Sequence, residues 1–227
     1  MQLHFILVEP QVPENVGAAA RAIKTMGFTQ LRLVNSDLHL HERASWLAHG
    51  AGDILEQTRS FPDLAAALAD MDLVIGTSAK PRHGRRASLA PDDVRALLGN
   101  KGSAVARAAV VFGREDRGLS NTELALCDLV TSIPLAQPYP SLNLAQAVML
   151  YAWELSSLNA AQEPALAAEA GQYRALRSRV EALLNQLERV PDSKLYDWAL
   201  ERLALLSEND VHFMHTLCQS LERALSR

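Results

Sequence analysis

Short apolar runs, rich in β-branched residues, recur along the first 158 residues and alternate with amphipathic segments. The apolar runs are residues 3–8, 31–35, 73–76, 109–113 and 129–133. The segments with helical spacing are 14–26, 43–50, 61–71, 91–98, 121–127 and 145–158. Strands that alternate with helices favour right-handed crossovers and a parallel sheet with helices on both faces. Each run is apolar along most of its length, as burial on both faces requires. We therefore expect an α/β domain over residues 1–158.

A different pattern follows this domain. Residues 159–172 form an Ala/Glu-rich connector, and what comes after contains no strand candidate. Helical spacing recurs at 173–190, 194–206 and 209–225. The last of these helices has one apolar face, formed by Val211, Met214, Leu217, Cys218, Leu221 and Leu225. A small helical extension over 173–227 buries little surface alone, so it should pack on the main domain or on a second subunit.

Composition limits the classes of function. With 48% hydrophobic and 21% charged residues the chain is typical of a globular protein, and its net charge of −4 supplies no global positive field for nucleic acid. Any basic patch must therefore be local. The two cysteines suggest neither a disulfide framework nor a metal site. We find no signal-peptide pattern and no run long enough to cross a bilayer, and expect a cytoplasmic protein.

Four loops follow the predicted strands, where open parallel sheets bind ligands. The first is E-P-Q-V-P-E-N-V-G-A-A-A-R-A, residues 9–22, in which Asn15 and Arg21 flank a glycine and three alanines. A small helix face there allows close approach of another group. Alternatively, Asn15 caps the helix and Arg21 is an ordinary surface residue. No G-x-G-x-x-G is present, so a dinucleotide fingerprint is not supported.

The second loop carries the only dense basic cluster. Thr77 and Ser78 end a buried strand, and Lys80, Arg82, Arg85 and Arg86 follow within seven residues. Phosphate backbone is the natural partner of such a cluster at a ligand-binding edge. The alternative is a solvated loop without a ligand.

The third loop, F-G-R-E-D-R-G-L-S-N, has four charged residues between Gly113 and Gly118. Glycine at both ends predicts a tight fold, and Ser120 with Glu123 fits a capping box for the next helix. Arg114 and Glu115 could also simply pair with each other on the surface.

The fourth loop is I-P-L-A-Q-P-Y-P-S-L-N-L-A-Q-A-V, residues 133–148. Its three prolines stiffen the chain. Either Ser141 or Asn143 can cap the following helix, which leaves the other for a ligand, or the two are alternative caps.

In order and spacing, N-V-G-A-A-A-R and the third and fourth loops resemble the three motifs of the SpoU/TrmH-type RNA ribose 2′-O-methyltransferases of the SPOUT superfamily. Within it the chain looks most like the TrmJ-type tRNA enzymes, which methylate the ribose at position 32 of the anticodon loop. The resemblance implies a trefoil knot in the C-terminal part of the α/β domain, S-adenosylmethionine as cofactor, tRNA as partner, and a homodimer with active sites at the subunit interface. It implies no metal.

The resemblance also assigns residues by motif position. The residues implied to contact the cofactor are Thr77, Ser78, Ala79, Gly113, Glu115, Ile133, Ser141 and Leu142. Those implied for catalysis are Arg21, Asn15, Ser141 and Asn143. Those expected to bind RNA are Lys80, Arg82, Arg85, Arg86 and Arg114. Arg21 would activate the ribose hydroxyl. Free arginine stays protonated at neutral pH, so both a base and a positioning role remain open.

The sequence leaves three alternative functions open. One is a 2′-O-methyltransferase that acts on another tRNA or rRNA position. Another is an inactive RNA-binding homologue, which the presence of every motif residue disfavours. The third is a nucleotide-dependent oxidoreductase, which the missing glycine fingerprint disfavours. Residues 161–227 carry 8 Lys+Arg against 10 Asp+Glu, so whether the extension contacts RNA is open.

Overall fold

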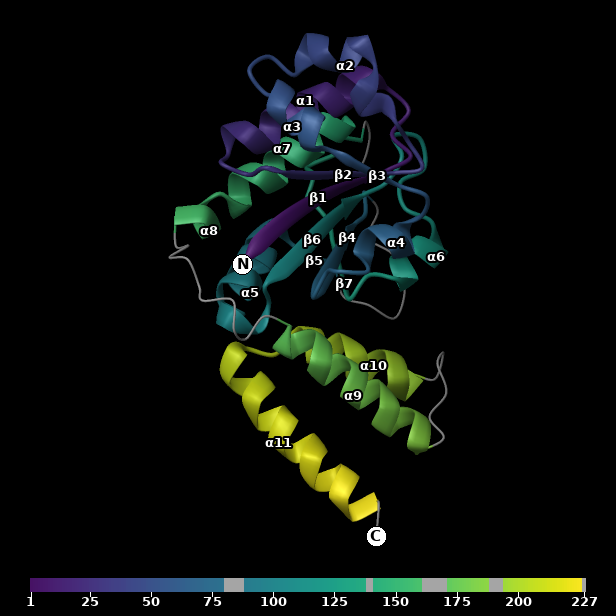
Figure 1. Cartoon of the computed structure of the whole chain (residues 1–227), viewed down its shortest axis with the longest axis vertical. Helices are drawn as coiled ribbons and strands as arrows, with labels where there is room; N and C mark the ends of the chain where they lie inside the picture. The colour runs from purple at the N-terminus through teal and green to yellow at the C-terminus, as the bar shows by residue number, and fades with distance from the viewer. Residues whose placement is uncertain (80–87, 138–140, 161–170, 188–193, 226–227) are drawn as a thin grey trace.

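The computed structural model describes residues 1–79, 88–137, 141–160, 171–187 and 194–225 (Figure 1). Its centre is a sheet of seven strands in the order β3-β2-β1-β6-β4-β7-β5, and every neighbouring pair is parallel. The strands are β1 Gln2–Val8, β2 Gln30–Val34, β3 Arg59–Phe61, β4 Leu73–Thr77, β5 Ser88–Leu89, β6 Arg107–Phe112 and β7 Leu129–Thr131. The predicted α/β class is confirmed.

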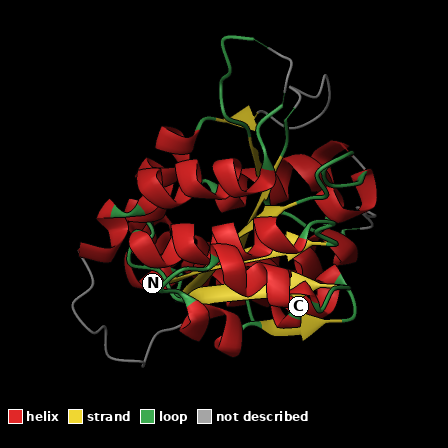
Figure 2. Cartoon of the chain, turned by 90° about the horizontal axis from the view of Figure 1, so that it is seen from above, coloured by secondary structure: helices red, strands yellow, loops and turns green. Residues whose placement is uncertain are grey.

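Helices lie on both sides of the strands (Figure 2). Those of the main domain are α1 Pro13–Thr25, α2 Glu42–Leu47, α3 Gly52–Gln57, α4 Leu64–Leu68, α5 Pro91–Gly99, α6 Asn121–Ala125, α7 Leu144–Leu155 and α8 Ser157–Ala160, with short 3-10 turns η1 Leu38–Leu40 and η2 Gly102–Ala104. Helices α4 and α6 share one core with one face of the sheet, and α1, α3, α5 and α7 share the other.

The alternation within each strand explains the two cores. In β1, Leu3, Phe5 and Leu7 join the core under α1 and α7, whereas Ile6 and Val8 join the core under α4 and α6. Successive side chains of a strand point to opposite faces, so a strand buried on both faces must be apolar at most positions. All five predicted strands are present for this reason.

Two strands and one helix were not expected. Strand β3 has three residues, of which Arg59 and Ser60 are exposed, and β5 has two residues, so neither shows an apolar run. Phe61 was predicted to begin a helix, which is wrong: it ends β3, and α4 begins at Leu64 after the Asp63 carboxylate caps the Ala66 N–H. Helix α3 is too short to show a periodic pattern.

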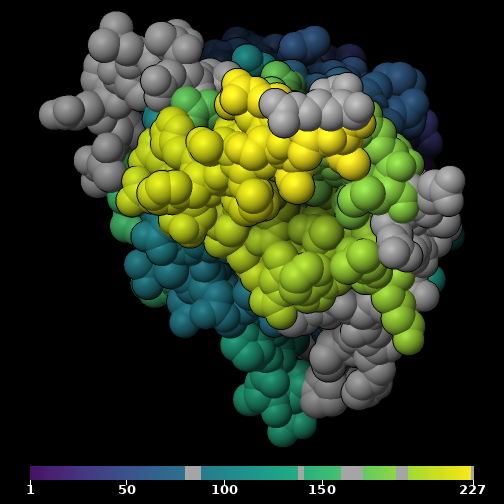
Figure 3. Space-filling view, turned by 90° about the horizontal axis from the view of Figure 1, so that it is seen from below, coloured from purple at the N-terminus to yellow at the C-terminus, as the bar shows by residue number. Residues whose placement is uncertain are grey.

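The extension consists of α9 Gln172–Gln186, α10 Lys194–Ala204 and α11 Glu208–Leu225 (Figure 3). It lies against the amino ends of the central strands, where Arg174 pairs with Asp72 and Arg177 with Asp128. These two aspartates immediately precede β4 and β7. Because the strands are parallel, the extension is at the opposite end of the sheet from the strands' carboxyl ends.

The apolar face predicted for the last helix is only partly buried. Val211 and Cys218 are buried, but Leu217, Leu221 and Leu225 are each about half exposed. Helix α11 contacts α9 and η2, and its second half extends away from the main domain (Figure 1). The knot stays a prediction, because residues 80–87 and 138–140 lie outside the described residues. Among the described residues, no helix is both long and apolar enough to span a membrane.

Candidate active site

A pocket of about 460 Å³ opens at the carboxyl ends of β4, β6 and β7. This volume is in the range of small-molecule sites. All eight residues predicted to contact a cofactor line it: Thr77, Ser78, Ala79, Gly113, Glu115, Ile133, Ser141 and Leu142. They come from separate loops, and the parallel sheet brings those loops to one edge.

Hydrogen bonds to neighbouring strands fix the part of the pocket wall that Thr77 and Ser78 form at the end of β4. The Thr77 hydroxyl donates to the Val111 carbonyl at 2.9 Å, and the Ser78 N–H donates to the Thr131 carbonyl at 2.9 Å. The loop therefore leaves the sheet in one defined direction.

The inner part of the pocket is apolar. Phe112, Leu119 and Tyr151 are almost fully buried and line it together with Leu144. The Tyr151 hydroxyl lies 3.0 Å from the Thr131 hydroxyl, and burial raises the pKa of Tyr151 to about 12. At neutral pH this phenol is uncharged, so its hydroxyl contributes a hydrogen bond and no charge.

The turn 113–118 needs glycine at both ends, as predicted. A Cβ on Gly113 would lie 2.1 Å from the Gly118 carbonyl carbon, and Gly118 has φ +69°. The Gly118 N–H donates to the Arg114 carbonyl at 2.8 Å, which closes the turn. All six residues of this turn line the pocket, so its shape decides the shape of the pocket.

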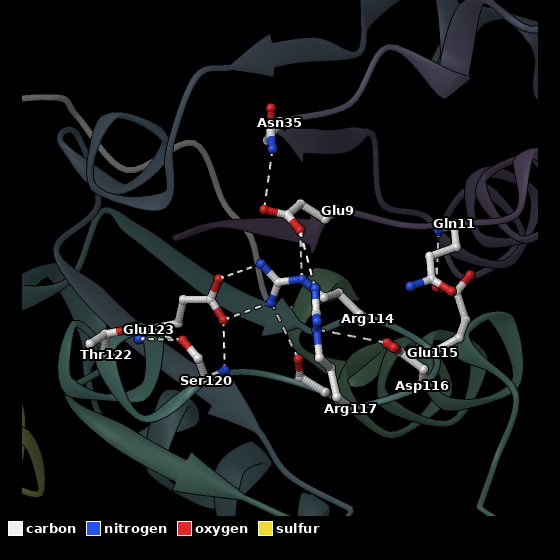
Figure 4. A network of polar contacts seen from close by, with 11 residues as sticks. Glu9, Gln11, Asn35, Arg114, Glu115, Asp116, Arg117, Ser120, Thr122 and Glu123 are labelled. Atoms are coloured by element: carbon white, nitrogen blue, oxygen red, sulfur yellow. Dashed lines mark hydrogen bonds and ion pairs between the residues drawn. The ribbon is translucent and has the colours of Figure 1, made fainter.

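Arg114 is an internal anchor of that turn (Figure 4). Its side chain is 9% exposed, its Nε donates to Glu9 at 2.7 Å, and its two terminal nitrogens donate to Glu123 at 3.0 and 2.9 Å. The bond from Arg114, with a second from Asn35, lowers the pKa of Glu9 to about 2. The alternative of a surface pair between Arg114 and Glu115 is wrong. Because this guanidinium is already bonded to two carboxylates, it is poorly placed to bind an RNA phosphate.

A chain of side chains joins the three motifs. Asn143 Nδ2 donates to Asn15 Oδ1 at 2.8 Å, and Asn15 Nδ2 donates to Glu115 Oε1 at 2.8 Å. The other Glu115 oxygen accepts the Gln11 N–H at 3.0 Å. One residue of each motif thus meets the next at the rim of the pocket.

These contacts decide two questions that the sequence left open. The capping interpretation of Asn15 is wrong, since α1 is preceded by Val12, makes no side-chain cap, and has Pro13 in its first turn. Asn143 caps α7 by accepting the Ala145 N–H at 2.8 Å. Ser141 is exposed and lines the pocket instead.

Arg21 is exposed on α1, the helix that also carries Asn15. Like Asn15 and Asn143, it is absent from the pocket lining, and of the four predicted catalytic residues only Ser141 lines the pocket. Helix α7 runs alongside α1, held by the Asn15–Asn143 contact at one end and by Asn159, which donates to the Met26 carbonyl at 3.1 Å, at the other.

The basic cluster Lys80, Arg82, Arg85 and Arg86 lies outside the described residues. Among the pocket residues that sequence reasoning missed are two charged ones, Asp116 and Arg117. The signal that could have found them was their position between the two glycines of the third loop, where any side chain must project from a tight turn.

Comparison with known proteins agrees with this geometry. Residues 2–153 match the SpoU rRNA Methylase family, and residues 170–225 match the C-terminal domain of the tRNA/rRNA methyltransferase LasT. The uncharacterized tRNA/rRNA methyltransferase LasT of Escherichia coli K12 is 44% identical over 230 residues, which cover 100% of both chains. The tRNA (cytidine-2′-O-)-methyltransferase TrmJ of Methanocaldococcus jannaschii is 35% identical over 68% of this chain and 67% of its own.

Solved structures share the fold. TrmJ from Z. mobilis superposes with a TM-score of 0.64 and 28% identity, covering 98% of this chain and 100% of its own. AviRb from Streptomyces viridochromogenes, solved with AdoMet, has a TM-score of 0.55, 19% identity and coverage of 71% and 62%, and is a likeness of fold alone. Since the family model spans residues 2–153, and with them the whole sheet and pocket, the chain belongs to the SpoU family of RNA methyltransferases.

Proposed function

We propose that this protein transfers a methyl group from S-adenosylmethionine to a ribose 2′-hydroxyl of tRNA, at position 32 of the anticodon loop, in the cytoplasm. The observation that carries the proposal is the contact chain Glu115–Asn15–Asn143 at the rim of a pocket. It brings one residue of each of the three motifs to one place, next to eight residues that a cofactor would contact.

The pocket fits the proposed cofactor. Its apolar interior suits an adenine ring, and the ordered backbone of 77–79 and 113–118 offers hydrogen-bonding groups around it. The charged residues in its lining balance, with the carboxylates of Glu115 and Asp116 beside the guanidiniums of Arg114 and Arg117. Bound there, S-adenosylmethionine would supply an electrophilic methyl group on a sulfonium.

The protein's own residues then position the nucleophile. A ribose hydroxyl is a poor nucleophile at neutral pH and needs both alignment and removal of its proton. The Ser141 hydroxyl, exposed in the pocket lining, can accept or donate a hydrogen bond to the sugar. Asn143 and Asn15 hold the loop of Ser141 against the turn of Glu115.

Arg21 would act on the site of a second copy. It lies on α1 outside the pocket of its own chain, while the adjacent α7 exposes Leu150 and Trp153 to 40% and 61%. An apolar helix face next to an exposed arginine supports a homodimer through α1 and α7, with Arg21 directed at the partner's pocket. There it would orient phosphate or stabilise charge on the sugar oxygen.

The substrate class rests on the relatives alone. TrmJ enzymes of M. jannaschii and other organisms are named tRNA methyltransferases, whereas LasT is named for both tRNA and rRNA. An rRNA ribose is therefore the second candidate. Lys80, Arg82, Arg85 and Arg86 would bind the RNA backbone in either case, and their replacement would flatten the salt dependence of binding.

Transfer of labelled methyl from S-adenosylmethionine to unmodified tRNA and rRNA transcripts tests the proposal directly. Nucleoside mass spectrometry then places the 2′-O-methyl group. We expect labelling of tRNA at the cytidine or uridine of position 32, and S-adenosylhomocysteine but not NAD to bind in calorimetry. Absence of transfer to both RNA classes, with cofactor bound, would leave only an inactive RNA-binding homologue.

A further inference from the structure

The two arginines of the turn 113–118 have opposite surroundings. Arg114 is 9% exposed and sits between the carboxylates of Glu9 and Glu123 (Figure 4). Arg117 is 68% exposed. Both line the pocket. The turn thus uses one cation for its own structure and presents the other to solvent.

The contacts of Arg117 are long. Its Nη2 lies 4.0 Å from Glu9 Oε2, and its Nε lies 4.0 Å from Asp116 Oδ1. Glu9 already accepts hydrogen bonds from Arg114 at 2.7 Å and from Asn35 at 3.2 Å. Exposed ion pairs at such distances contribute little to stability. Arg117 can therefore leave these partners for a better anion at small cost.

The base of the Arg117 side chain is fixed in space. Gly113 and Gly118 set the backbone of the turn, and Glu115, two residues before Arg117, is bonded to Asn15 and to the Gln11 N–H. The guanidinium therefore projects from a rigid support beside the contact chain of the proposed active site. A flexible surface arginine would lack this placement.

Two anionic groups could meet a guanidinium at this position: an RNA phosphate and the carboxylate of the cofactor's methionine. The pocket interior, with Phe112 and Tyr151 each 1% exposed, is separated from solvent, whereas Arg117 faces solvent. A ligand group that arrives from solution suits that exposure better than one enclosed in the pocket. Arginine also matches phosphate geometry with two parallel N–H donors.

We propose that Arg117 binds a backbone phosphate of the RNA substrate at the mouth of the pocket, an assignment that rests on the proposed function. The carboxylate of the neighbouring Asp116, which is 53% exposed, competes with the RNA phosphate for the Arg117 guanidinium and also repels the phosphate. The two residues thus act in opposite directions. Removing the cation weakens RNA binding, and removing the carboxylate strengthens it.

Filter binding of labelled, unmodified tRNA transcripts across a salt series measures both effects without requiring turnover. The variants are Arg117→Gln and Asp116→Asn, with Arg59→Gln as the matched control. Arg59 is exposed on the edge strand β3 and its replacement changes the net charge equally. We expect Arg117→Gln to weaken binding by roughly 5- to 10-fold and to lower the salt slope by about 1. Asp116→Asn should tighten binding about 2-fold, a small electrostatic gain at an exposed site.

Calorimetry with S-adenosylhomocysteine separates the two anions. We expect Arg117→Gln to bind it as the wild type does. RNA binding by Arg117→Gln equal to that of Arg59→Gln would overturn the assignment, and so would a parallel loss of affinity for S-adenosylhomocysteine, which would give the guanidinium to the methionine carboxylate. Wild-type protein that binds tRNA without methylating it contradicts the proposed reaction and still tests Arg117. Wild-type protein that does not bind tRNA is tested in the same way with rRNA transcripts, and failure to bind either RNA refutes both.

Discussion

Asn143 donates a hydrogen bond of 2.8 Å to Asn15, 128 residues away in the chain. The orientation of both amides follows from the cap of α7. Because Asn143 Oδ1 accepts the Ala145 N–H, its Nδ2 must face Asn15, and Asn15 Nδ2 must then face Glu115. One helix cap thereby fixes the donor direction of the whole chain of contacts.

Asn143→Asp keeps the cap of α7 but removes the hydrogen bond to Asn15. A carboxylate still caps α7 and is favoured at a helix N-terminus, so the melting temperature should stay close to that of the wild type. The donor to Asn15 is lost, and Asn15 Oδ1 then faces a carboxylate oxygen, so that two acceptors repel each other. We expect kcat for methyl transfer to fall by about 100-fold, the size of effect that small misplacement causes. Asn143→Ala is the control for the cap, and should lose about 1 kcal/mol of stability. Full activity in Asn143→Asp would show that the amide contact is dispensable.

Arg21→Ala should abolish transfer while the protein stays folded, because the Arg21 side chain is exposed on α1. If Arg21 serves the partner's pocket, mixing Arg21→Ala with Asn143→Asp subunits restores one intact site in each heterodimer. Random exchange gives about a quarter of wild-type activity, since half of the dimers are mixed and each has one of two sites. No recovery on mixing would place Arg21 in the site of its own chain.

Trp153→Glu and Leu150→Glu should convert a dimer to monomers, because a charge at the centre of an apolar contact is buried unpaired. Light scattering after gel filtration measures the mass. Phe213→Glu is the matched control, since Phe213 is 76% exposed on α11 in the extension. Monomers produced by Phe213→Glu, and not by Trp153→Glu, would move the interface to the extension.

Lys101→Met should loosen the extension from the domain. Lys101 exposes no surface, and its Nζ donates to the carbonyls of Ala204 at 2.6 Å and Leu206 at 2.5 Å. Losing the donor leaves two acceptors unpaired, at a cost of roughly 2–4 kcal/mol. Limited proteolysis and urea unfolding report the change, and Lys194→Met, at an exposed position of α10, is the control. Unchanged protection of 173–225 would contradict this role.

The pH dependence of the stability of Glu9→Gln tests whether the Glu9 carboxylate anchors the pocket turn. The pKa of Glu9 is lowered to about 2 from an ordinary value of 4.5, so its pairing with Arg114 stabilises the fold fully above pH 4.5 and is lost as the pH falls toward 2. Urea unfolding should show the wild type more stable than Glu9→Gln near pH 6, with the difference shrinking near pH 4. A difference independent of pH would mean that the charge of Glu9 is not what anchors Arg114.

The sequence predicted the strands correctly wherever both faces of a strand are buried. Strands β1 and β6 have to be apolar at most positions because both of their faces are covered, and that pattern is visible without coordinates. Strand β3, exposed at Arg59 and Ser60, carries no such pattern. Its existence depends on backbone pairing with β2 at the sheet edge, which side-chain periodicity does not record.

The sequence alone determined which loops carry the site and which residue types they hold, since glycines, prolines and caps act locally on the chain. Only the tertiary structure decided which side chains meet. Arg114 and Arg117 are the same residue type and lie only three residues apart in the sequence. Contacts with Glu9, 105 residues away, and with Glu123 make Arg114 an internal anchor and leave Arg117 facing solvent. Such pairings depend on where parallel strands end in space, and no local pattern encodes that.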